Sequence, residues 1–185
     1  MSHPRVLDRN ASALVVIDVQ EAYRGLTVEH ERMIRGLRRL VDAAKIVGIP
    51  VLATEQYPKG LGHLLPEVSE ALPAGTAIVE KRSLSCYAEP RFAERIDALQ
   101  RRQVVVCGLE AHACVNQTVH DLLQRGYQVH VPFDAISSRF EPDYRIGWEK
   151  MMGSGAIPST VEMACLEWLR SADAPEFKAV QKLLK

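Results

Sequence analysis

The sequence alternates short apolar runs, rich in β-branched residues, with longer amphipathic stretches. The apolar runs are residues 13–19, 49–54, 77–80, 104–107 and 128–132. Apolar residues at helical spacing mark the amphipathic stretches 29–47, 89–101, 115–126 and 160–171. Because the apolar runs have no polar face, they belong in a parallel sheet that helices cover on both sides. We therefore predict a three-layer α/β fold with a doubly wound, mainly parallel sheet of about six strands.

Length and charge limit what the chain binds. A chain of 185 residues predicts one domain, spanning residues 1–185. Its 23 basic and 23 acidic residues balance, so the overall field offers no footprint for nucleic acid or for an anionic membrane surface. No stretch approaches about 18 consecutive apolar residues, so we expect no membrane span. The expected partner is a small molecule or a second copy of the chain.

The cysteines indicate a reducing compartment. Cys86, Cys107, Cys114 and Cys165 lie far apart, with no C-x-x-C pair among them. No apolar secretory leader precedes residue 13. We therefore expect a cytoplasmic protein whose thiols stay reduced.

Ligands of doubly wound sheets bind outside the carboxyl ends of the strands, so the residues that follow each apolar run are the candidate site residues. They are Asp18, Glu55, Gln56, Lys81, residues 110–114 and Asp134. Acids and lysines are expensive to place beside a core unless they are paired. A carboxylate, an ammonium and a thiol are thus expected at one edge of the sheet.

Cys114 follows the apolar run 104–107 and a turn at Gly108, and it stands at the start of the next predicted helix. The start of a helix carries partial positive charge, which favours the thiolate, the nucleophilic form of cysteine. A free cysteine is also often just a small buried apolar residue. The position of Cys114 alone leaves both interpretations open.

Asp18 and Lys81 favour the chemical interpretation. Taken separately, Asp18 is an acid that caps a local segment and Lys81 is an exposed charge at a strand end. Beside a thiol, however, a carboxylate exchanges a proton with the reacting groups, and an ammonium stabilises negative charge. The combination therefore predicts a reactive thiol centre.

The chain resembles the isochorismatase-like cysteine hydrolases. The resemblance rests on Asp18-Val19-Gln20, on Lys81 with Ser83, Ser85 and Tyr87 after it, and on the segment 108–115. Segments 54–62, 108–115 and 154–156 are most similar to the isochorismatase domain-containing subgroup. The resemblance covers residues 13–169 and implies a Rossmann-like fold.

The resemblance also implies roles for the site residues. Cys114 corresponds to the nucleophile, Asp18 to the general base and acid, and Lys81 to the residue that positions and polarises both. Proteins of this family have a cis peptide bond that would fall between Leu109 and Glu110. The backbone N–H groups of Glu110 and Cys114 would then form the oxyanion hole.

Departures from the family pattern narrow the expected chemistry. Related nicotinamidases bind a metal through an Asp-x-His pair and a further histidine, whereas this chain has Glu55-Gln56-Tyr57 and only His63 downstream. We therefore expect no metal and no cofactor. True isochorismatases cleave a vinyl ether without a cysteine at the position of Cys114. The thiol favours attack on an amide or a related acyl carbon.

Four residues on loops are expected to line the rim of the pocket and to touch substrate: Tyr23, Gln56, Tyr57 and Tyr87. His112 is an alternative base for the thiol, although side chains two residues apart need not face each other. The carboxylate of Glu110 is a candidate partner for Lys81 or Arg82. Cys86 is either a packing residue or a resolving thiol for an oxidised Cys114.

Two further expectations concern assembly and function. In this family the segment 139–148, together with residues 154–156, commonly takes part in subunit contacts, so we expect a homo-oligomer. The tail 174–185 predicts an amphipathic helix that docks on the body or on a neighbour. The favoured function is metal-independent hydrolysis of a small amide or acyl bond through a thioester. The alternative is a non-catalytic binding or redox-sensing scaffold with a reactive Cys114. A nuclease is disfavoured by the neutral charge.

Overall fold

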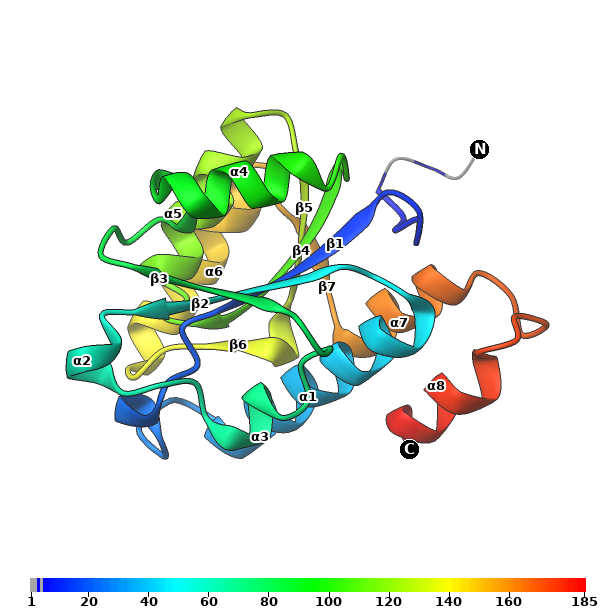
Figure 1. The fold of residues 1–185 in the computed structure, drawn as a ribbon, viewed down its shortest axis with the longest axis horizontal. Coiled ribbons are helices and arrows are strands. Elements are labelled where there is room, and N and C mark those ends of the chain that lie inside the picture. The colour runs from blue at the N-terminus through cyan, green and yellow to red at the C-terminus, as the bar shows by residue number, and fades with distance from the viewer. Residues whose placement is uncertain (1–2, 4) are drawn as a thin grey trace.

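The computed structural model describes residue 3 and residues 5–185. Within these residues one sheet of seven strands runs through the molecule in the order β3-β2-β1-β4-β5-β7, with β6 beside β4 (Figure 1). Every pairing in this sheet is parallel. The strands are β1 (Ser12–Ile17), β2 (Val51–Gln56), β3 (Ala77–Lys81), β4 (Gln103–Leu109), β5 (Gln128–Pro132), β6 (Ile136–Ser137) and β7 (Ile157–Ser159). The predicted α/β fold with a parallel sheet is confirmed.

Helices cover both faces of the sheet and complete the three layers. One face packs against α1 (His30–Val47), α7 (Val161–Leu169) and α8 (Phe177–Leu184), and the other against α4 (Pro90–Ala98), α5 (Cys114–Gln124) and α6 (Glu141–Gly153). Two short helices, α2 (Pro58–Leu61) and α3 (Pro66–Ser69), lie in the connection between β2 and β3. No helix in the described part of the chain is both long and apolar enough to cross a membrane.

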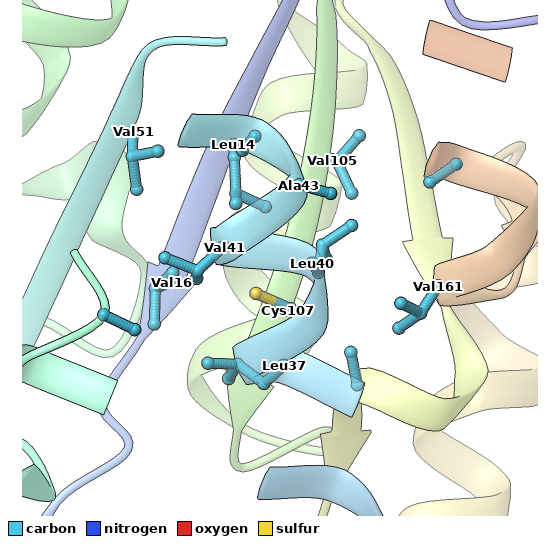
Figure 2. Packing of buried hydrophobic residues seen from close by; sticks show 14 of the residues in the cluster. Leu14, Val16, Leu37, Leu40, Val41, Ala43, Val51, Val105, Cys107 and Val161 are labelled. Carbon is cyan, nitrogen blue, oxygen red and sulfur yellow. The ribbon is translucent and has the colours of Figure 1, made fainter. Parts of the chain in front are cut away.

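The central strands are buried on both faces, as their apolar runs predicted. In β1, Leu14 and Val16 belong to the core on the α1 side, whereas Val15 and Ile17 belong to the core on the α4 and α5 side. Figure 2 shows Leu14 and Val16 beneath the apolar side chains of α1. This alternation follows from the two-residue period of a strand.

Local signals in the sequence set the helix ends. Helix α1 ends at Gly48, which adopts the left-handed conformation with φ of 76° that favours glycine. Helix α4 begins with Pro90, whose missing N–H is not needed in the first turn. The predicted tail helix forms as α8, and Val180 is fully buried against the body of the same chain.

Strands β6 and β7 were not among the predicted runs, because they have only two and three residues. So short a segment carries no period that distinguishes a strand from a loop. Strand β6 nevertheless matters for the site, since it pairs with the end of β4 and directs the chain back over it.

Gly108 allows the ends of β1 and β4 to approach each other. It is paired with Ile17 and has φ of 117°, and a Cβ atom at this position would collide with the backbone oxygen of Ile17. Only glycine fits such an approach. Residues 18 and 114, which follow these two strands, are thereby brought to the same edge, where the strand order reverses direction.

Candidate active site

Asp18, Lys81 and Cys114 meet at the carboxyl edge of the sheet. Asp18 follows β1, Lys81 ends β3 and Cys114 begins α5, directly after β4 and its turn. Their exposed fractions are 2%, 2% and 7%. The Nζ atom of Lys81 donates to Oδ2 of Asp18 over 2.7 Å, and the carboxylate of Asp18 lies close enough to the Cys114 thiol to raise its pKa. The structure thus brings together the three residues that the strand ends predicted.

Both carboxylate oxygens of Asp18 have a donor. The ammonium of Lys81 donates to Oδ2, and the hydroxyl of Thr54 donates to Oδ1 over 2.7 Å. The backbone of Asp18 lies in the left-handed region, with φ of 51°. Aspartate tolerates this conformation better than most residues. The carboxylate is therefore held in one orientation, away from water, and faces the thiol.

The ammonium of Lys81 is enclosed by acceptors. It donates to Oδ2 of Asp18 and to Oε1 of Gln56, both at 2.7 Å, and to the carbonyls of Leu84 and Ser83 at 3.1 and 3.2 Å. Burial lowers the pKa of Lys81, but the charge of Asp18 and the neighbouring thiols outweigh it, so that the pKa is raised overall. Lys81 is therefore a fixed positive charge rather than a proton donor.

The Cys114 thiol is neutral at rest. Burial and the Asp18 carboxylate together raise its pKa to about 12, while Lys81 acts in the opposite direction. The pKa of Cys114 is thus raised rather than lowered, so its place at the start of α5 is not enough to hold it as a thiolate. The thiol donates a long hydrogen bond to Oε1 of Gln56, 3.9 Å from Sγ.

The segment between β4 and α5 supplies backbone donors. The peptide bond between Leu109 and Glu110 is cis. The carbonyl of Glu110 accepts from the N–H groups of Ala113 and Val115. Among the described residues, neither the N–H of Glu110 nor that of Cys114 donates a hydrogen bond to another group. Two free donors thus lie beside the thiol.

The carboxylate of Glu110 is buried but does not reach Lys81 or Arg82. Instead, Nε of Arg139 donates to its Oε1 over 3.0 Å, and Nδ1 of His112 lies 3.3 Å from its Oε2. His112 also contacts the hydroxyl of Ser138 at 3.0 Å. His112 is therefore directed at Glu110 and Ser138 and not at the thiol, which makes it a support for this segment.

Of the four predicted rim residues, Gln56 contacts the thiol centre directly. Gln56 contacts both Lys81 and Cys114. Burial raises the pKa of Tyr23, and the charges of Glu110 and Cys114 raise it further. Tyr57 follows β2 with φ of 39° and is 41% exposed, with its ring 4.1 Å from the guanidinium of Arg82.

Tyr87 departs from the prediction. Its hydroxyl donates to Asp97 in the last turn of α4 over 2.8 Å, and its ring lies 4.0 Å from the guanidinium of Arg125 beyond the end of α5. Both partners lie toward the amino ends of the strands, so the ring is directed away from the thiol. The direction of the side chain depends on helix residues that no local pattern reveals.

Cys86 is fully buried, and its sulfur lies 3.6 Å from the hydroxyl of Thr54. Burial raises its pKa to about 11. Thr118 receives a hydrogen bond from the N–H of Cys86 and donates one to the carbonyl of Cys114. These contacts are those of a packing residue that links the loop after β3 to α5.

Two functional residues escaped the sequence reasoning. Thr54 orients Asp18. In the sequence, the only indication of this role was a hydroxyl side chain at the end of the apolar run 49–54. Gln20, which is fully buried, accepts from the N–H of Gln56 over 2.7 Å and donates to the carbonyls of Gln56 and Gly62. It therefore fixes the loop that carries Gln56. Its signal was the D-x-Q sequence that Asp18 begins.

No group of three or more His, Cys, Asp or Glu side chains in the described residues is arranged to hold a metal ion. The site is instead composed of one carboxylate, one ammonium, one thiol and two free backbone donors. This set serves proton exchange and anion stabilisation at an atom next to the thiol.

Comparison with known proteins places this site in a family. The sequence profile of the isochorismatase domain matches residues 12–163, which is most of the chain. The chain belongs to the isochorismatase family. The predicted resemblance is thereby confirmed, and membership of the isochorismatase family supports a hydrolase.

Relatives of this isochorismatase-family chain cover nearly all of it. Isochorismatase domain-containing protein 2 of Danio rerio is 37% identical over 179 residues, which are 96% of this chain and 89% of the relative. The secreted isochorismatase effector Isc1 of Phytophthora sojae is 38% identical over 180 residues, covering 95% and 85%. The solved structure of MAR1 ribonuclease from Caenorhabditis elegans has a TM-score of 0.92 and 41% identity, covering 97% and 92%.

Proposed function

We propose that this isochorismatase-family chain hydrolyses a small amide, or a related C–N or acyl bond, through a thioester on Cys114 and without a metal ion. One observation carries the proposal: the buried carboxylate of Asp18 binds the ammonium of Lys81 and lies close enough to the thiol of Cys114 to raise its pKa. A single group can then accept the proton of the thiol and later deliver it to a leaving amine.

In the first half of the reaction, Sγ of Cys114 attacks the carbonyl carbon while Asp18 takes the thiol proton. The carbonyl oxygen becomes an oxyanion, and the free N–H groups of Glu110 and Cys114 stabilise it. Protonated Asp18 then gives its proton to the nitrogen, the C–N bond breaks, and the amine leaves. The acyl group remains on sulfur as a thioester.

In the second half, water takes the place of the amine. Asp18 accepts a proton from this water while the water oxygen attacks the thioester carbon. The same two N–H groups stabilise the second oxyanion. The C–S bond breaks, the proton on Asp18 returns to sulfur, and the acid product leaves. The resting thiol and carboxylate are thereby restored.

The neutral thiol fits this sequence of steps. A thiol whose pKa is raised to about 12 does not attack until its proton has an acceptor, and Asp18 is that acceptor. Proton transfer and carbon–sulfur bond formation are then coupled to the presence of a carbonyl group. Lys81 stays charged throughout, orients Asp18 and lowers the energy of the negative charge at the centre.

The test is turnover of a panel of small amides together with mass spectrometry of the intact protein. The proposal expects at least one amide to be hydrolysed and to leave an acyl adduct on Cys114. Cys114→Ala abolishes both, whereas Cys165→Ala, which removes a buried thiol on α7, abolishes neither. A Cys114→Ala protein that still hydrolyses the amide would overturn the proposal.

Two other functions are separated by the same experiment. A binding or redox-sensing scaffold predicts no turnover and no acyl adduct, but oxidation of Cys114 by peroxide. The name of the Caenorhabditis elegans relative makes ribonuclease activity a second alternative function. That activity predicts RNA cleavage that survives Cys114→Ala, since hydrolysis of a phosphodiester does not proceed through a thioester. The thiol between carboxylate and free N–H groups favours acyl transfer over both.

We further propose a homo-oligomer in a reducing, cytoplasmic setting, which binds neither nucleic acid nor membrane. Phe140, just before α6, is 60% exposed, and Ile146, within α6, is 51% exposed. A second copy of the chain would cover such apolar side chains. All four cysteines are free and buried. Size-exclusion chromatography with light scattering tests the assembly, and a monomer would contradict it.

The cellular compartment needs its own test, because one relative, from Phytophthora sojae, is a secreted effector. Fractionation of cells provides this test.

A further inference from the structure

A second hollow lies at the opposite edge of the sheet from the thiol centre. It has a volume of about 300 Å³, and its walls include Arg101, Arg102, Arg125, Tyr87, Tyr127 and Asp97. We call it the arginine pocket. Arg101 and Arg102 precede β4, Tyr127 precedes β5, and Arg125 follows α5. The pocket therefore lies at the amino ends of the strands.

The arginine pocket is separate from the candidate active site. Helix α5 begins with Cys114 and ends just before Arg125, and its eleven residues span about 16 Å. None of the residues that line the pocket contacts the thiol, Asp18 or Lys81. A ligand held by Arg125 would therefore leave the reacting atoms untouched.

The positive charge of the pocket is not neutralised by its own acid. Both oxygens of Asp97 accept hydrogen bonds from tyrosine hydroxyls, from Tyr127 over 2.5 Å and from Tyr87 over 2.8 Å. In the described part of the chain, no ion pair involves Arg101, Arg102 or Arg125. Three guanidinium groups thus share one hollow with a single carboxylate, which leaves the side chains of the pocket with a net positive charge.

Two of the guanidinium groups are held in place by the aromatic walls. Arg125 lies 4.0 Å from the ring of Tyr87, and Arg102 lies 5.9 Å from the ring of Tyr127. Arg125 also donates to the carbonyl of Asp121 over 3.1 Å. Guanidinium groups that are already ordered lose less freedom when they bind an anion.

We propose that the arginine pocket binds a small organic phosphate. A guanidinium matches two oxygens of an oxyanion, and a phosphate monoester presents three strongly accepting oxygens and nearly two negative charges. A carboxylate has only two oxygens for three guanidinium groups. The volume of about 300 Å³ leaves room for an organic body against the tyrosine rings.

The simplest rival explanation is that the arginines only complement the ends of helices. The carboxyl ends of α4 and α5 both lie at the pocket, and each carries roughly half a negative charge that attracts cations. Half-charges of this size do not offset three guanidinium groups, but they oppose any anion. Binding must therefore be measured rather than assumed from charge.

The experiment is titration calorimetry of the full chain with inorganic phosphate at about pH 8 and constant ionic strength, where phosphate is mostly a dianion. Saturable binding is expected, with acetate and dimethyl phosphate binding more weakly because each offers only two anionic oxygens. Arg102→Gln and Arg125→Gln should each weaken phosphate binding by about tenfold.

Two further variants guard against misfolding and against unspecific charge effects. Asp97→Asn should strengthen phosphate binding, because it removes the negative charge of the pocket, and a misfolded protein would not gain affinity. Arg38→Gln removes an exposed arginine on α1, outside the pocket, and should bind phosphate as the wild type does. No saturable binding, equal binding of acetate, or unchanged binding by the two pocket variants would each overturn the inference.

Discussion

The ammonium of Lys81 lies 2.7 Å from Oδ2 of Asp18, in a place where both residues are only 2% exposed. Two charges that have left water stabilise each other only when the contact is short and their other donors and acceptors are satisfied. Here Thr54 and Gln56 satisfy them. Lys81 and Asp18 therefore behave as one unit, and the loss of either leaves a buried charge without its partner.

Lys81→Met is accordingly expected to lower the free energy of unfolding by about 3 kcal/mol or more. The double variant Asp18→Asn with Lys81→Met should lose less than the sum of the two single losses, since it removes both charges together. Urea denaturation measures all three. Lys59→Met, which removes an exposed lysine of α2, serves as the control and should leave stability unchanged. Strictly additive losses would show that the two charges do not act as a pair.

Alkylation of Cys114 should respond to its two charged neighbours in opposite directions. Burial and the Asp18 carboxylate raise the pKa of the thiol, whereas Lys81 lowers it. Iodoacetamide reacts with the thiolate already present at equilibrium, so Asp18→Asn should speed its alkylation of Cys114 at about pH 8, and Lys81→Met should slow it, each by about tenfold for a change of one pKa unit. Mass spectrometry of the labelled peptide measures both rates. A change in the same direction in both variants would contradict the arrangement.

Stability should fall at alkaline pH. Burial raises the pKa of Cys86 to about 11 and that of Cys165 to about 12, from 9.0 in the unfolded chain. Below about pH 9 both states hold the thiol proton, so the contribution is fully present. Above it, the unfolded chain releases protons that the folded chain retains, and stability is lost until the folded thiols ionise. Each thiol contributes a loss of about 1.4 kcal/mol per pH unit.

Urea denaturation at about pH 8 and at about pH 10 measures this effect, because the thiol pKa values predict that the free energy of unfolding falls between these two pH values. Cys165→Ala removes one titrating thiol, so its loss between the two conditions should be smaller by about 1.4 kcal/mol. The cavity that it leaves costs the same at both pH values and cancels. An identical loss in wild type and variant would contradict the raised pKa.

The sequence was sufficient to place the thiol centre because the fold is a parallel sheet. Apolar runs identify the strands, and all parallel strands end at the same edge, so Asp18, Lys81 and Cys114 were expected together without any contact being known. The family resemblance pointed to the same three residues. Gly108 was also visible in the sequence, although the approach of Ile17 that requires it was not.

What the sequence did not reveal depends on directions and burial. Tyr87 was expected at the pocket rim, but Asp97 and Arg125, from two different helices, direct it to the opposite edge. The start of a helix was expected to favour the thiolate of Cys114, because the sequence shows the helix start but not the burial that raises the pKa of the thiol. Both errors concern surroundings assembled from distant parts of the chain.

Thr54 offers a test of how the carboxylate is positioned. Its hydroxyl donates to Oδ1 of Asp18 over 2.7 Å, and both groups are buried. Thr54→Val keeps the shape of the side chain but leaves that oxygen without a donor, which costs about 1–3 kcal/mol. The carboxylate is then free to rotate away from the thiol, so kcat/KM for an amide substrate should fall by about tenfold.

Thr76→Val is the matched control for Thr54→Val. It removes a hydroxyl that donates to the carbonyl of Pro73 over 2.7 Å, far from the thiol centre. We expect it to leave kcat/KM unchanged even if stability falls, because no group at the site loses a partner. Equal effects of the two substitutions on kcat/KM would mean that Thr54 contributes only to the core. A loss confined to Thr54→Val would identify its hydroxyl as the group that holds Asp18 in line with Cys114.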